Sequence, residues 1–70
     1  MSTEIKIKTP YIELDSLLKF ASLVSTGGEA KIVIKSGEVL LNGEVCTMRK
    51  KKIFPGDSVS FEGKTITVIG

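Results

Sequence analysis

The sequence contains no histidine and no tryptophan, and only one cysteine, one tyrosine and two prolines among its 70 residues. A single thiol cannot form an internal disulfide, and without histidine or a second thiol Cys46 has no companion for a metal site. No motif places a nucleophile beside a base, and no glycine-rich loop matches a phosphate-binding or dinucleotide-binding pattern. We therefore expect no catalysis and no cofactor, and Cys46 to be an unreactive, half-buried hairpin residue.

Long apolar runs are also missing. No run approaches the roughly 20 residues that a membrane span requires, and the N-terminus lacks the apolar stretch of a signal peptide. We therefore expect a cytoplasmic protein with no membrane partner. The length predicts a single domain over 1–70 with a small core, because a chain of this size buries only about 60% of its unfolded surface. We also expect a monomer.

Positive charge is concentrated in one part of the chain. The formal net charge is +2, but residues 31–52 carry six cations and two glutamates, or +4, and the remainder carries four cations and six carboxylates, or −2. The six cations are Lys31, Lys35, Arg49, Lys50, Lys51 and Lys52. A local basic patch on a slightly acidic body favours a polyanion as partner. A solvated lysine-rich loop is the simpler alternative.

The central stretch predicts a short helix over 27–36 followed by a hairpin. Thr26 is expected to accept a hydrogen bond from the Glu29 amide, while the Glu29 carboxylate accepts one from the Thr26 amide, as in a capping box. Gly37 can take the left-handed conformation that ends a helix. Asn42-Gly43 is typical of a type I′ hairpin turn.

Gly27 and Gly28 open this helix and allow two interpretations. They make a tight turn between helices, or they leave bare amides onto which a phosphate can dock. Lys31 and Lys35 lie four residues apart on one side of the same helix, which places cations near those amides.

The rest of the chain predicts an α+β protein. An apolar stripe predicts a first helix over 14–24, so that only Ser25 and Thr26 separate the two helices. Strands are expected over 4–8, 39–41, 44–46, 58–61 and 65–69, with residues 46–52 as a loop. Phe20, Phe54 and Phe61 lie at apolar-periodic positions and are expected in the core. With only Tyr11 expected at the surface, contacts to phosphates are favoured over base reading.

Taken together, several short motifs resemble the RNA-binding domain named after the fourth protein of the small ribosomal subunit, the S4 domain or alpha-L RNA-binding motif. They are Tyr11-Ile12-Glu13-Leu14, Leu17-Leu18-Lys19, Ser25 to Lys31, Gly37-Glu38-Val39, Val45, Arg49 and Pro55-Gly56-Asp57. Their order and spacing cover nearly the whole chain and are most similar to the small stand-alone bacterial members.

The resemblance implies two helices packed on a small, mainly antiparallel sheet. It also implies RNA, ribosomal or transfer RNA foremost and possibly on the ribosome, gripped by Thr26, Gly27, Gly28, Lys31, Lys35 and the loop Arg49 to Lys52. Many members of the wider family carry arginines where this chain has Glu13 and Gly27, so those two contacts do not carry over. The basic run of the loop can compensate for them.

Two other functions remain open at this stage. The Leu41 to Glu44 segment, the Pro55 to Phe61 segment and a C-terminal glycine are similar to ubiquitin-like sulfur carriers, although only Gly70 is present of the Gly-Gly tail that they activate. A protein-interaction adaptor with an acidic partner is the second alternative, and competition with RNA distinguishes it from an RNA-binding protein.

Overall fold

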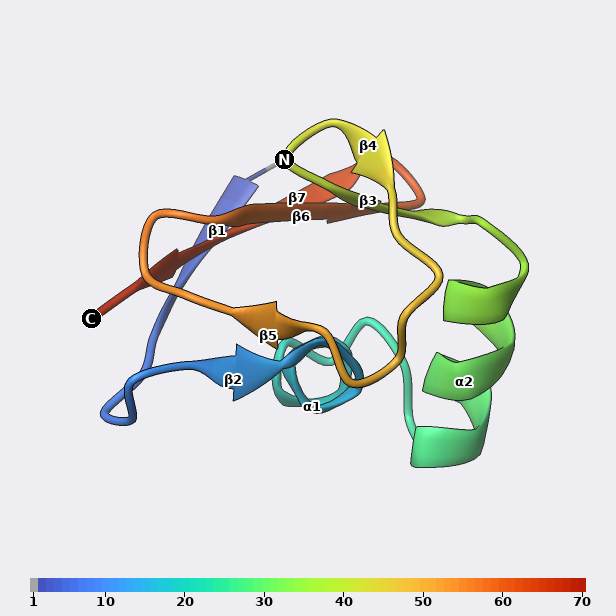
Figure 1. The fold of residues 1–70 in the computed structure, drawn as a ribbon, viewed down its shortest axis with the longest axis horizontal. Helices are drawn as coiled ribbons and strands as arrows, with labels where there is room; N and C mark the ends of the chain where they lie inside the picture. The colour runs from blue at the N-terminus through green and yellow to red at the C-terminus, as the bar shows by residue number, and fades with distance from the viewer. Residues whose placement is uncertain (1) are drawn as a thin grey trace.

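Two helices and a small two-stranded sheet lie on one side of a five-stranded sheet in the computed structural model, which describes residues 2–70 (Figure 1). The helices are α1 (Leu14–Phe20) and α2 (Gly27–Lys35), and they pack against each other. The strands are β1 (Ser2–Lys6), β2 (Ile12–Glu13), β3 (Val39–Leu41), β4 (Glu44–Val45), β5 (Lys52–Ile53), β6 (Ser58–Phe61) and β7 (Lys64–Ile69). The predicted α+β class is confirmed.

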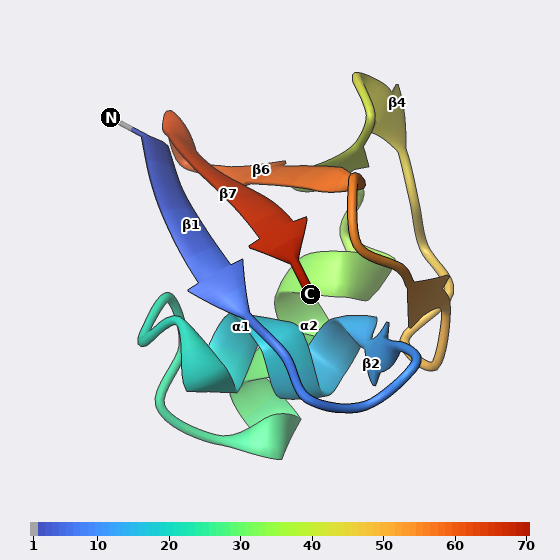
Figure 2. The same cartoon turned by 90° about the vertical axis from the view of Figure 1, so that its left-hand side faces the viewer.

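The larger sheet has the strand order β1-β7-β6-β3-β4. Its neighbours are antiparallel except β1 and β7, which run side by side in the same direction (Figure 2). The prediction of a first strand over 4–8 is wrong by two residues, because Lys6 pairs with Ile69, the last residue of β7. The hairpin strands agree with prediction to within one residue at each end.

The start and the end of α2 are determined by local hydrogen bonds. Thr26 Oγ1 accepts the Glu29 amide at 3.1 Å, as predicted. The Glu29 carboxylate accepts the Ser25 amide at 2.8 Å, and the predicted bond to the Thr26 amide is not the one that forms. Gly37 follows the helix with φ 84°, and its amide donates to Ile34. Such a left-handed residue ends a helix by pairing its last carbonyls.

Helix α1 ends at Phe20, four residues earlier than predicted. Ser22 has φ 61°, and its amide donates to Lys19 while the Leu23 amide donates to Leu18. This is the hydrogen-bond pattern of a left-handed helix end, with serine where glycine is usual. Consequently six residues connect the helices rather than two, although Val24 is still buried at 6% exposure.

Replacing Ser22 by glycine should stabilise the protein. A side chain at positive φ is strained, and glycine removes that strain at an exposed position. We expect the free energy of unfolding to rise by about 1 kcal/mol, or the melting temperature by about 4–8 °C for a domain of this size. Ser22→Ala is the matched control and should not stabilise. An equal gain in both variants would mean that the backbone at this position is not strained.

The core lies between the larger sheet and the helices. Its buried apolar residues are Ile7, Leu14, Leu17, Leu18, Val24, Ala30, Ile34, Val39, Ile53, Val59, Phe61, Ile66 and Val68. Phe61 is in the core as predicted, but Phe20 and Phe54 are 64% and 48% exposed, so their predicted burial is wrong. Phe20 lies at the end of the shortened helix, and Phe54 follows β5, in which successive side chains face opposite sides. Tyr11 is exposed, as expected.

Candidate nucleic-acid interface

The backbone of the basic loop, residues 49–52, is attached to the start of α1. The Leu14 amide donates to the Lys51 carbonyl at 2.9 Å, and the Asp15 amide donates to the Arg49 carbonyl at 3.1 Å. Glu13, at the N-cap position of α1, makes no side-chain cap. The loop carbonyls therefore satisfy helix amides that otherwise lack an acceptor, and this holds the loop in place.

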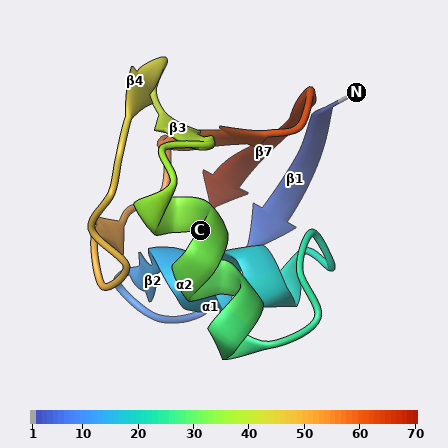
Figure 3. The same cartoon turned by 90° about the vertical axis from the view of Figure 1, so that its right-hand side faces the viewer.

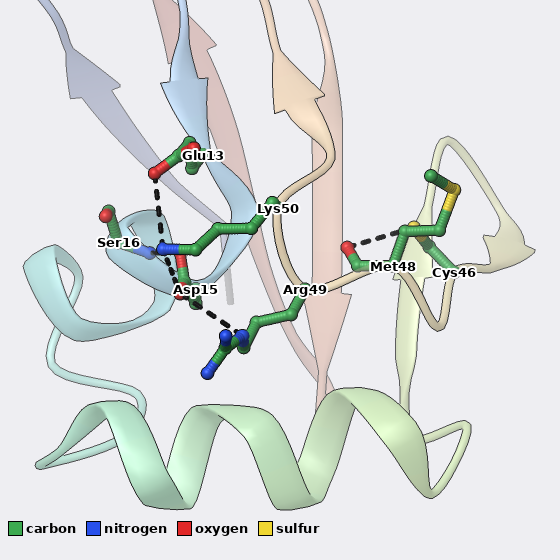
Figure 4. A network of polar contacts seen from close by, with 7 residues as sticks. All are labelled: Glu13, Asp15, Ser16, Cys46, Met48, Arg49 and Lys50. Carbon is green, nitrogen blue, oxygen red and sulfur yellow. Dashed lines mark hydrogen bonds and ion pairs between the residues drawn. The ribbon is translucent and has the colours of Figure 1, made fainter.

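Two carboxylates beside this attachment pair with two of the loop cations (Figure 4). Asp15 is buried at 6% exposure, and its Oδ2 lies 3.1 Å from Lys50 Nζ and 3.9 Å from Arg49 Nε. Glu13 Oε1 lies 3.4 Å from the same lysine nitrogen. A hydrogen bond from Lys50 to Asp15, followed by the charges of Asp15 and Glu13, raises the pKa of Lys50 above its usual range. Lys50 therefore stays charged, but carboxylates partly neutralise it.

The remaining loop cations have a different environment. Among residues 2–70, neither Lys51 nor Lys52 lies within 4.0 Å of a carboxylate, and both side chains are exposed. Lys52 also begins β5, so the prediction of a loop through residue 52 is wrong at this end. Its pairing with Glu13 in β2 is a contact between distant parts of the chain, which local sequence periodicity does not report.

Helix α2 contributes a second group of cations. Gly27, Lys31 and Lys35 are four residues apart and so form one stripe along the helix, next to the buried stripe of Ala30 and Ile34. Both lysines are exposed, and no carboxylate of the described chain pairs with them. The stripe starts at the first amides of the helix, which have no acceptor within the helix itself.

Lys19 lies beside the start of this stripe, although it was not among the candidate residues predicted from the sequence. A Cβ atom added at Gly27 would lie 4.0 Å from Lys19 Nζ, so the ammonium group lies close to the start of α2. From the sequence, Lys19 is predicted only to occupy a polar position of the first helix. Its location beside Gly27 depends on how the two helices pack.

The basic loop and α2 lie near each other in space. Figures 1 and 3 both place the loop beside α2, and Figure 4 shows the Arg49 side chain directed from the loop toward that helix. At the other end of α2, a Cβ atom on Gly37 would lie 3.7 Å from Val45 in β4, which leads into the loop. The structure therefore brings the predicted cations to neighbouring elements, and their action as one face remains a prediction.

Cys46 is half-buried, as predicted, and its Sγ lies 4.0 Å from the Met48 carbonyl oxygen. In residues 2–70 no cluster of three potential metal ligands occurs, and no helix there is long and apolar enough to cross a membrane.

Comparison with known proteins gives consistent matches over nearly the whole chain. The model of the S4 domain family matches residues 5–69. YbcJ of Escherichia coli (strain K12) is 40% identical over 62 residues, which is 89% of either chain. RlbA of Bacillus subtilis (strain 168), named a probable ribosome maturation protein, is 40% identical over 63 residues, or 90% of this chain and 89% of its own.

A solved structure supports the same relationship. The solution structure of Escherichia coli YbcJ, described as revealing an alpha-L motif involved in RNA binding, superposes with a TM-score of 0.71 at 36% identity. The superposition covers 99% of this chain and 86% of that one. Since the family model and relatives above 30% identity each span most of the sequence, this protein belongs to the S4 domain family.

Proposed function

We propose that this protein binds structured RNA without catalysing a reaction, mainly through phosphate contacts made by Lys31, Lys35 and the basic loop. The observation that carries the proposal is the attachment of a four-cation loop to the start of α1, beside a helix with its own exposed lysines. Ordering the loop in the free protein reduces the entropy lost when it binds a phosphate chain.

The first amides of α2 are proposed to add an anion contact. Thr26 caps the helix, while Gly27 and Gly28 have no side chains that would shield their amides from a ligand. The helix dipole favours negative charge at this end, and Lys19 lies beside it. A phosphate placed there would also reach Lys31 one turn further along.

The proposal predicts a steep dependence of affinity on salt. Lys31, Lys35, Lys51 and Lys52 have no carboxylate partner among the described residues, so about four phosphate contacts are available. Four contacts give a slope of log affinity against log salt near −3, or a loss approaching a hundredfold between 50 and 200 mM salt. A filter-binding titration of a structured RNA at several salt concentrations measures the slope. A slope near zero would contradict the proposal.

Ribosomal RNA is the favoured target, because RlbA is named for ribosome maturation. Crosslinking the protein to RNA in cells and sequencing the attached fragments tests this choice. Enrichment of ribosomal RNA supports it, whereas enrichment of transfer RNA would keep RNA binding and change the target. The family assignment gives no support to the sulfur-carrier alternative. If this protein bound an acidic protein and RNA failed to displace that protein, the adaptor alternative would be favoured.

Replacing Cys46 by serine should leave RNA binding unchanged. The thiol is half-buried, and it belongs to no cluster of three potential metal ligands among the described residues. We expect affinities within about twofold of the unmodified protein for each RNA tested, as for a surface substitution worth less than about 0.5 kcal/mol. A larger loss in a variant with an unchanged circular dichroism spectrum would assign the thiol a role in binding.

A further inference from the structure

The small sheet formed by β2 and β5 has an outward side that carries two aromatic rings. Ile12 pairs with Ile53 and Glu13 pairs with Lys52, so continuing the same antiparallel register places Tyr11 opposite Phe54. Successive side chains of a strand face opposite sides. Ile53 is fully buried, which puts Tyr11 and Phe54 on the side that faces away from the core.

The two rings form a compact cluster with one cation. Their centroids are 5.8 Å apart with the ring planes tilted by 50°, and Lys52 Nζ lies 5.0 Å from the centre of the tyrosine ring. Tyr11 is 36% exposed and Phe54 is 48% exposed. The lysine lies over part of the tyrosine ring, and the exposed remainder of the two rings leaves aromatic surface open to a ligand beside a cation.

The backbone beside both rings is restrained. The Thr9 hydroxyl donates to the Tyr11 carbonyl at 2.8 Å. The Phe54 amide donates to the Asp57 carboxylate at 2.9 Å, and the Asp57 amide donates back to the Phe54 carbonyl at 3.0 Å. The aromatic pair therefore exists in the free protein and does not have to be assembled by its ligand.

The position and charge of this cluster favour a nucleotide as the occupant. Lys52 belongs both to the cluster and to the basic loop, so a phosphate chain lying on the loop arrives directly beside the rings. Every base has a flat face that stacks on an aromatic side chain, and its own phosphate can pair with the ammonium group. A purely apolar partner would gain nothing from that lysine.

We propose that Tyr11 and Phe54 form a stacking site for one unpaired base of the bound RNA, with Lys52 on the adjoining phosphate. This inference rests on the proposed RNA binding and adds a preference for RNA that has an unpaired nucleotide beside a helix. It adds one base contact to a binding mode for which the sequence favoured phosphate contacts, and it depends on the exposure of Phe54, which the sequence did not predict.

The test compares two RNA hairpins with the same stem, one containing a single-nucleotide bulge and one fully paired. The unmodified protein should bind the bulged RNA about tenfold or more tightly than the paired RNA, as expected for one base stacked on an aromatic side chain. The double variant Tyr11→Leu/Phe54→Leu should lose this preference and retain the salt slope. Phe20→Leu, which changes a more exposed phenylalanine outside the cluster, is the matched control and should retain the preference.

Tyrosine fluorescence provides a readout that needs no variant. Tyr11 is the only tyrosine and the chain has no tryptophan, so tyrosine emission reports on this site alone. Binding of the bulged RNA should quench the emission, after correction for absorption by the RNA. Polyphosphate, which has charge but no bases, should bind the cations and quench less.

The possible outcomes separate this inference from the proposed function. If the unmodified protein binds neither hairpin with a measurable salt slope, the proposed function is wrong. If it binds both equally and the double variant behaves identically, phosphate binding stands and the stacking site is overturned. The aromatic pair would then be available for a protein partner.

Discussion

Replacing Lys31, Lys35 and Lys51 together by glutamine should lower the affinity for structured RNA by about a hundredfold or more at 0.1 M salt. Each phosphate contact contributes about 0.7–0.9 to the salt slope, and at this salt concentration one unit of slope corresponds to about a factor of ten in affinity. Three lost contacts should therefore reduce the slope from near −3 to near −1. The loss should be similar for every RNA tested, because phosphates carry no sequence information.

These three lysines are suited to the experiment because their removal should not disturb the fold. All are exposed, and none lies within 4.0 Å of a carboxylate in the part of the chain that the structure describes. Exposed substitutions of this kind usually change the free energy of unfolding by less than about 0.5 kcal/mol. An unchanged melting temperature would confirm that any loss of affinity comes from the removed charges.

A second triple variant controls for net charge. Lys6, Lys8 and Lys64 are also exposed and lie outside the basic loop and α2. Their replacement by glutamine changes the formal net charge from +2 to −1, which is two minus three, as in the first variant. We expect a much smaller loss of affinity. Equal losses in the two variants would mean that general charge attraction, and not the proposed site, accounts for binding.

Replacing Asp15 by asparagine should destabilise the protein and yet make its RNA binding more sensitive to salt. Asparagine can still fill the buried position and accept the Ser16 amide, which Asp15 Oδ1 now accepts at 2.7 Å. It removes the charge that pairs with Lys50 and Arg49. Loss of charge from such an acceptor lowers the free energy of unfolding by about 1–3 kcal/mol.

The effect on RNA binding follows from the same pairs. Lys50 is now partly neutralised by Asp15, and without that carboxylate its charge becomes available to a phosphate. The loop backbone keeps its two hydrogen bonds to the amides of residues 14 and 15, which the substitution leaves in place. We therefore expect the salt slope to steepen by about one unit.

Glu13→Gln is the matched control for this experiment. It removes the same charge from a carboxylate that is 42% exposed and lies 3.4 Å from Lys50 Nζ. An exposed ion pair contributes little, so stability should change by less than about 1 kcal/mol. If Asp15→Asn instead flattened the salt slope, the carboxylate would serve mainly to position the loop cations for binding.

The features that the sequence predicted correctly are those determined by neighbouring residues. The cap at Thr26, the helix end at Gly37 and the Asn42-Gly43 turn are all present, with Asn42 and Gly43 at φ 52° and 86°. A cap or a turn involves residues two to four apart, so its hydrogen bonds can be read from short motifs. The order and spacing of such motifs also identified the family.

The tertiary structure decided what depends on residues far apart in the chain. Helix α1 ends at Phe20 because Ser22, two residues later, takes a positive φ, and a serine gives no sequence signal for that conformation. Strand β5 exists only because Lys52 and Ile53 pair with β2, although residues 13 and 52 are 39 apart in the chain. That pairing exposes Phe54 beside Tyr11. Next to the β2–β5 pairing, Lys50 forms its ion pair with Asp15.

Residue types thus indicated which side chains are candidates for binding RNA, whereas the environments of these side chains are determined by the fold. Four consecutive cations predict a basic loop on charge alone. Only the packing of the loop on α1 determines that Arg49 and Lys50 face carboxylates while Lys51 and Lys52 do not. The physical reason is that Coulomb interactions depend on distance in space, and separations along the chain do not report that distance.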